Sequence, residues 1–113
     1  MTNTYKNGNA TIFLYQKEKT FIGVCLELDI VDEDTDADVL KKRMKERVES
    51  YIAYIVTNNK GEELLNRNAP DEYWYEFSKY LQAVQTNIAF RKSSPSLMRA
   101  SVESIPMQDF AKA

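Results

Sequence analysis

The fold is decided by residues 11–31, TIFLYQKEKTFIGVCLELDIV, and by the longer amphipathic run that follows them. Two segments rich in β-branched and aromatic residues, 11–16 and 20–26, flank a charged turn at residues 17–19. Short apolar runs of this composition on either side of a tight polar turn are typical of a β-hairpin. The sequence therefore predicts two antiparallel strands near the start of the chain.

Both faces of the first strand are apolar. Ile12 and Leu14 share one face, and Phe13 and Tyr15 share the other, because successive side chains of a strand point in opposite directions. We therefore expect both faces to pack against something. Gly23, inside the second strand, indicates a bulge or a close backbone approach.

Two helices are predicted after a short third strand at residues 28–31. Thr35 is a favourable N-cap with Asp38 three residues on, and a helix over about residues 36–56 has apolar residues at spacings of three and four. These residues are Leu40, Met44, Val48, Tyr51, Ile52 and Ile55. A second, aromatic helix over about residues 70–84 is expected to dock through Tyr73, Trp74, Phe77 and Leu81.

The sequence predicts an α+β fold: a small antiparallel sheet of β-β-β-α order, a second helix, and further strand(s) near the C-terminus. The single domain would comprise a loose arm (residues 1–9), the β-β-β-α core (10–58), the second helix (70–84) and an extension (85–113). A sheet this small leaves open edges as well as the apolar second face, and a second copy of the chain would cover both. We therefore also expect a homo-oligomer, most simply a two-fold dimer.

Composition narrows the possible chemistry. The 113 residues include 15 Lys and Arg against 17 Asp and Glu, no histidine and one cysteine. Without histidine, triads that use an imidazole base and imidazole-bound zinc are excluded. Cys25 lies in an apolar run and is interpreted as a small core residue of a reducing compartment. We expect no enzyme, no catalytic residues and no cofactor. No stretch has the pattern of a secretory signal or the length of a membrane span, which indicates a cytoplasmic protein without membrane contact.

Carboxylates are concentrated between residues 27 and 38, which contain no cation. They are Glu27, Asp29, Asp32, Glu33, Asp34, Asp36 and Asp38. A calcium loop counted from Asp32 would need glycine at position 6 and glutamate at position 12, where Ala37 and Arg43 stand. We therefore predict no metal site.

Two interpretations of this acidic stretch stay open. It is a solvated loop whose last acids favour the N-terminus of the following helix, or a surface that attracts a basic partner. On the second interpretation, the partner-binding residues are Asp29, Asp32, Glu33, Asp34 and Asp36.

The stretch FIGVCLELDIVDEDTDADVLKKRMKERVESYI, residues 21–52, resembles the HicB-like antitoxin family. The matching residues are Cys25, Glu27, Leu28, Ile30, Thr35 and Leu40, and the likeness covers about residues 11–58. It implies a three-stranded sheet with a helix packed across it, similar to a pared-down ribonuclease H fold. It also implies a non-catalytic antitoxin whose partner is a HicA-like toxin, a small basic RNA-cleaving protein. The glycine usual before the capping threonine is absent, because Glu33 and Asp34 stand there.

The end of the chain leaves alternatives. Antitoxins of this family usually finish with a DNA-binding module, which residues 85–113 do not convincingly supply. This segment has four basic residues against two acidic ones, which is few for phosphate contacts. A nucleic-acid-binding regulator that uses Arg91, Lys92 and Arg99 is the alternative function, and a structural or oligomerisation domain is the third.

Overall fold

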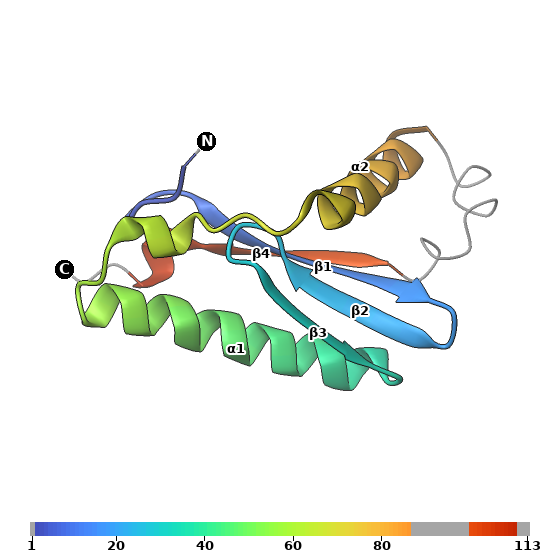
Figure 1. Ribbon diagram of the computed structural model, residues 1–113, viewed down its shortest axis with the longest axis horizontal. Coiled ribbons are helices and arrows are strands. Elements are labelled where there is room, and N and C mark those ends of the chain that lie inside the picture. Colours follow the sequence, from blue (N-terminus) through green and yellow to red (C-terminus); the bar gives the residue numbers. More distant parts are fainter. Residues whose placement is uncertain (1, 87–99, 111–113) are drawn as a thin grey trace.

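The protein has an α+β fold in which a four-stranded antiparallel sheet lies between two helices (Figure 1). The computed structural model describes residues 2–86 and 100–110. The strand order is β3-β2-β1-β4. The strands are β1 (Asn9–Lys17), β2 (Thr20–Cys25), β3 (Ile30–Asp34) and β4 (Ser101–Pro106), and the helices are α1 (Ala37–Thr57) and α2 (Asp71–Thr86). Short 3₁₀ helices span Glu62–Leu65 and Met107–Phe110. The predicted fold class is confirmed.

The two faces of β1 belong to two separate cores. Ile12 and Leu14 are buried with residues of α1, whereas Phe13 and Tyr15 are buried with residues of α2. The expectation that both faces pack is therefore confirmed. In Figure 1, α1 and α2 lie on opposite sides of the sheet. The open face that favoured a dimer in the sequence is thus covered by the chain itself.

The hairpin is confirmed, but the third strand begins later than predicted. Strand β1 pairs with β2 from Ile12 opposite Cys25 to Lys17 opposite Thr20. The chain then turns, because the backbone N–H groups of Leu28 and Asp29 both donate to the carbonyl of Cys25. Asp29 has a φ of 55° in this turn. Strand β3 consequently spans Ile30–Asp34 rather than residues 28–31.

Helix α1 is confirmed and begins one residue after its predicted start. Its N-cap is Asp36 rather than Thr35, because the Asp36 carboxylate accepts from the N–H groups of Asp38 (2.9 Å) and Val39 (3.1 Å). Its buried stripe is Leu40, Met44, Val48, Ile52 and Ile55. Tyr51 is only partly buried and donates its hydroxyl to the carbonyl of Leu64 at 2.7 Å.

Gly23 lies where the Met44 side chain of α1 packs against the sheet. A Cβ atom added there would lie 2.9 Å from Met44 Cγ and 3.3 Å from Leu14 Cδ1. Contacts under 3 Å force a neighbour to move, so the close neighbour of Gly23 is the Met44 side chain rather than the predicted backbone segment, and the pairing of β1 with β2 has no bulge there. The absence of a side chain on β2 is what lets Met44 reach the strand.

Helix α2 docks through aromatic side chains. The Phe13 ring lies 5.4 Å from that of Phe77 and 5.6 Å from that of Tyr80, measured between ring centroids. Such edge and tilted contacts are the arrangements that aromatic pairs favour. Trp74 also packs against this core, but Leu81 is 43% exposed, so its predicted docking role is wrong.

The N-terminal arm is anchored, so the prediction of a loose segment over residues 1–9 is wrong. Asn3 is buried, and its side chain donates to the carbonyl of Leu65 and accepts from the N–H of Asn9. Asn3 and Asn66 also exchange hydrogen bonds between backbone and side chain in both directions, at 2.6 and 2.9 Å. The arm therefore ties the segment after α1 to the start of β1.

The expected further strand is confirmed as β4, which pairs with β1 from Asn9 opposite Pro106 to Leu14 opposite Ser101. Its Ile105 and the following Met107 complete the core beneath α1. Residues 87–99 and 111–113 of the predicted extension lie outside the described residues.

We predict that Gly23→Val lowers the free energy of unfolding by about 2 kcal/mol, because its methyl groups would overlap Met44 and Leu14. Gly23→Ala should cost less, since the Met44 side chain can move. Urea unfolding would measure both changes. Thr20→Val, at the start of the same strand, is the control and should leave stability nearly unchanged. Equal stability of Gly23→Val and the wild type would contradict the close packing.

Candidate functional site

The acidic stretch is divided between the two faces of the sheet. We expected a loop, but Asp32, Glu33 and Asp34 lie in β3. Asp32 is opposite Gly23, on the face of α1, whereas Glu33 is opposite Ile22, on the face of α2. The pleat of the strand therefore separates carboxylates that are adjacent in sequence.

Arg43 of α1 holds the two carboxylates that face it. Its Nε lies 2.6 Å from Asp32 Oδ2 and its Nη1 lies 3.1 Å from Asp34 Oδ2, while Arg47 Nη1 is 3.4 Å from Asp32 Oδ2. The hydrogen bond from Arg43 lowers the pKa of Asp32. The pKa of Asp34 is lowered mainly by the hydrogen bond from the N–H of Asp36, and next by the hydrogen bond from Arg43. These two acids are already paired within the molecule.

The outer edge of β3 is closed at Glu33. Its N–H donates to Asp32 Oδ1 at 2.8 Å, and its carbonyl accepts from Arg43 Nη2 at 3.1 Å. An edge strand pairs with another strand through such backbone groups, and proteins block this pairing with charged side chains. The geometry disfavours the addition of a strand from another molecule at this point.

The remaining acids have different roles. Asp36 caps α1, and Glu27 accepts from the N–H and the hydroxyl of Thr11 at 2.7 and 2.8 Å. Asp29 and Glu33 are exposed, and among the described residues neither forms an ion pair. Of the five predicted partner-binding residues, Asp32 and Asp34 are therefore ion-paired and Asp36 is a cap, whereas Asp29 and Glu33 have no such role among the described residues. Arg91, Lys92 and Arg99 lie outside the described residues.

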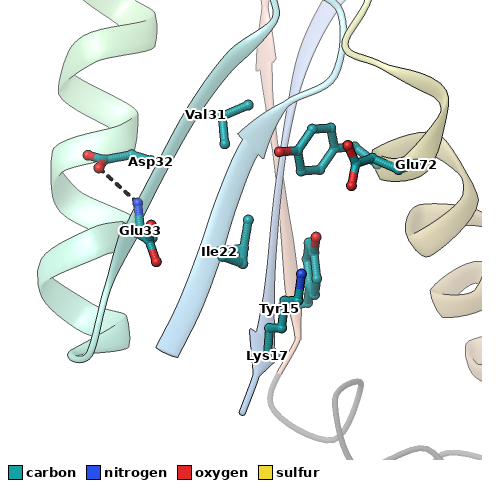
Figure 2. A pocket seen from close by; sticks show the side chains of 8 residues that line it. Tyr15, Lys17, Ile22, Val31, Asp32, Glu33 and Glu72 are labelled. Atoms are coloured by element: carbon teal, nitrogen blue, oxygen red, sulfur yellow. Dashed lines mark hydrogen bonds between the residues drawn. The ribbon is translucent and has the colours of Figure 1, made fainter. Parts of the chain in front are cut away.

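Glu33 borders a cleft between the sheet and the first turns of α2. The cleft consists of two hollows of ≈ 280 and ≈ 340 Å³ that share Tyr15, Lys17 and Glu72. The first hollow is also lined by Ile22, Val31, Asp32, Glu33 and Tyr73, and the second by Gln16, Glu18, Tyr75 and Glu76. Figure 2 shows Tyr15, Ile22 and Val31 on three neighbouring strands, Glu72 facing them from α2, and Asp32 pointing back towards α1.

The register of the sheet explains this arrangement. Tyr15 on β1 is opposite Ile22 on β2, and Ile22 is opposite Glu33 on β3. These three side chains therefore form one row across the face that α2 covers. The row passes from a buried ring, through a half-buried aliphatic side chain, to an exposed carboxylate.

The tyrosines of the cleft lie in a negative field. Burial, followed by the nearby carboxylate of Glu76, raises the pKa of Tyr15 to about 12. Burial also raises the pKa of Tyr73, with smaller contributions from Glu72, Asp29 and Glu33. Both phenols consequently stay protonated at neutral pH and can donate hydrogen bonds. The same field favours a bound cation.

One carboxylate of the cleft, that of Glu76, already has a cation beside it. Glu76 Oε2 is buried and lies 3.0 Å from Lys79 Nζ, at an ion-pair distance although without the angles of a hydrogen bond. Among the described residues, no cation forms an ion pair with Glu72 or Glu33. Sequence reasoning missed the cleft because it assigned the aromatic residues of α2 to packing alone. The available signal was the pair of acids, Asp71 and Glu72, at the start of an aromatic helix.

Other chemistry in the described part of the chain is limited. Burial raises the pKa of the Cys25 thiol to about 12, so it stays a neutral thiol, in agreement with the predicted core role. Residues 2–86 and 100–110 contain no group of three or more cysteine, aspartate or glutamate side chains that could hold a metal ion. None of the helices in these ranges is long and apolar enough to cross a membrane.

The chain matches no family model, no curated protein and no solved structure. Function is therefore inferred from the fold and from the chemistry of this surface.

We predict that Arg43→Gln lowers the melting temperature by a few degrees at neutral pH. Because the folded protein depresses the pKa of Asp32 and Asp34, their pairing stabilises it above the ordinary carboxyl range. This stabilisation is lost as pH falls below about 4. The difference in melting temperature between variant and wild type should therefore become smaller as the pH is lowered, and thermal unfolding measured over a range of pH would show this. Arg67→Gln is the matched control, and a deficit that persisted in acid would contradict the ion pairs.

Proposed function

We propose that the protein is a non-catalytic cytoplasmic binding protein of the HicB-like antitoxin type. Its partner is a small basic RNA-cleaving protein of the HicA-like kind, which it neutralises by covering part of its surface. The resemblance of residues 11–58 to this family supports the proposal. So does the absence of histidine from the chain.

The observation that carries the proposal is the free negative charge beside the cleft. Asp29 and Glu33 are exposed, and Glu72 faces the same hollow from α2. Unpaired surface carboxylates gathered on one side attract a basic protein and accelerate its encounter. Asp32 and Asp34 contribute less, because Arg43 pairs with both and Arg47 also pairs with Asp32. The contact is made by side chains, since the edge of β3 is closed at Glu33.

We predict that the double variant Asp29→Asn, Glu33→Gln captures the basic partner less well and with a flatter salt dependence. Removal of rim charges acts mainly on association, which salt screens. Asparagine tolerates the positive φ of position 29, so the fold should be kept. The test is co-expression with the product of any neighbouring gene that encodes a small basic protein, followed by co-purification over a range of ionic strengths.

The matched control is Glu46→Gln, Glu49→Gln on α1, which removes the same charge and should capture normally. Unchanged capture by the double variant Asp29→Asn, Glu33→Gln would exclude Asp29 and Glu33 from the contact. Failure of the wild-type protein to capture a basic, RNA-cleaving neighbour would reject the antitoxin proposal itself.

We also propose a two-fold dimer, and the argument for it now rests on the free edge of the sheet alone. With the second face covered by α2 and β3 closed at Glu33, the outer edge of β4 is the remaining place for sheet pairing among residues 2–86 and 100–110. Light scattering should give about twice the 13.1 kDa of the chain. A mass of one chain at micromolar concentration would reject the dimer.

A further inference from the structure

The cleft between the sheet and α2 combines three kinds of wall. Ile22 and Val31 form an apolar side, and Val31 is 38% exposed although it lies on the face that α2 covers. The rings of Tyr15 and Tyr73 line the same hollow, and Glu33 and Glu72 border it from β3 and α2. Figure 2 shows that the labelled side chains of Ile22 and Glu72 come from opposite walls.

These walls match a long side chain with an apolar stem and a cationic head. An aliphatic stem lying over Ile22 and Val31 removes apolar surface from water. Aromatic rings attract a cation placed over their faces. Two carboxylates on different elements require a head group that donates in more than one direction, and the planar guanidinium, with five N–H donors, does this better than an ammonium.

We propose that this cleft receives one arginine side chain of the partner protein. The inference rests on the proposed function, because it takes the partner to be basic, and it adds where and how that partner is held. The stem lies along Ile22 and Val31, and the guanidinium sits between Glu33 and Glu72 against the tyrosine rings. Lys17, which lines both hollows, competes for the same carboxylates.

The cleft can be tested without the partner. The probe is a capped peptide, acetyl-Gly-Arg-Gly-amide, and its matched control carries citrulline, which has the same shape without the charge. In methyl NMR spectra the arginine peptide should shift the Ile22 and Val31 signals in a saturable manner. The citrulline peptide should bind about tenfold more weakly.

Four single variants, one of them a control on α1, sharpen the test. Glu33→Gln and Glu72→Gln should each weaken the arginine peptide by roughly threefold to tenfold, while Glu46→Gln on α1 should leave it unchanged. Lys17→Gln should tighten binding by about twofold, because it removes a competing positive charge. A gain of affinity is not expected from mere damage to the fold. Equal responses to arginine and citrulline, or shifts confined to other surfaces, would overturn the assignment.

The partner experiment separates this inference from the proposed function. If the wild-type protein captures the basic partner and the double variant Glu33→Gln, Glu72→Gln captures it equally, the function stands and the arginine site is wrong. If no basic partner is captured but the arginine peptide binds the cleft and responds to the variants, the site stands and the antitoxin function is wrong.

Discussion

The structure depends on the burial of both faces of β1. Between Ala10 and Tyr15 only Thr11 retains intermediate exposure, so consecutive side chains enter two different cores. A buried large apolar side chain contributes about 1.5–3 kcal/mol, and a strand that alternates between two such environments must have a cover on each side. This requirement places α1 and α2 on opposite faces and makes β1 an interior strand, flanked by β2 and β4.

The same alternation governs the charges of β3. Because the strand is pleated, Asp32 and Asp34 meet Arg43 on one face, and Glu33 faces the other with Val31. The paired acids hold the strand to α1 and help to close its edge, whereas Glu33 forms no ion pair with any described residue. One short acidic segment thus contains both paired and unpaired carboxylates, and the separation follows from register rather than from residue type.

Elements defined by local pattern could be predicted from the sequence. The hairpin and the stripe of α1 both follow from periodicity and composition. Features that rest on distant partners could not be predicted. Asn3 is fixed by Asn66, 63 positions away, and no local signal distinguishes it from an asparagine in a mobile arm. The prediction of an acidic loop was wrong for the same reason. The pairing of Asp32 with Arg43 depends on how α1 crosses the sheet.

The cleft results from the way α2 docks on the sheet. Acidic residues in the first turn of a helix are favourable because they face its positive dipole end, and Glu72 occupies that position in α2. The aromatic side chains of the same helix fix its first turn over Tyr15 and Ile22, which places Glu72 across from Glu33. Neither carboxylate needs a partner for folding, since Glu33 is exposed and Glu72 already benefits from the helix end. Their juxtaposition follows from docking α2 on β1, and the field that they create is therefore available to a ligand.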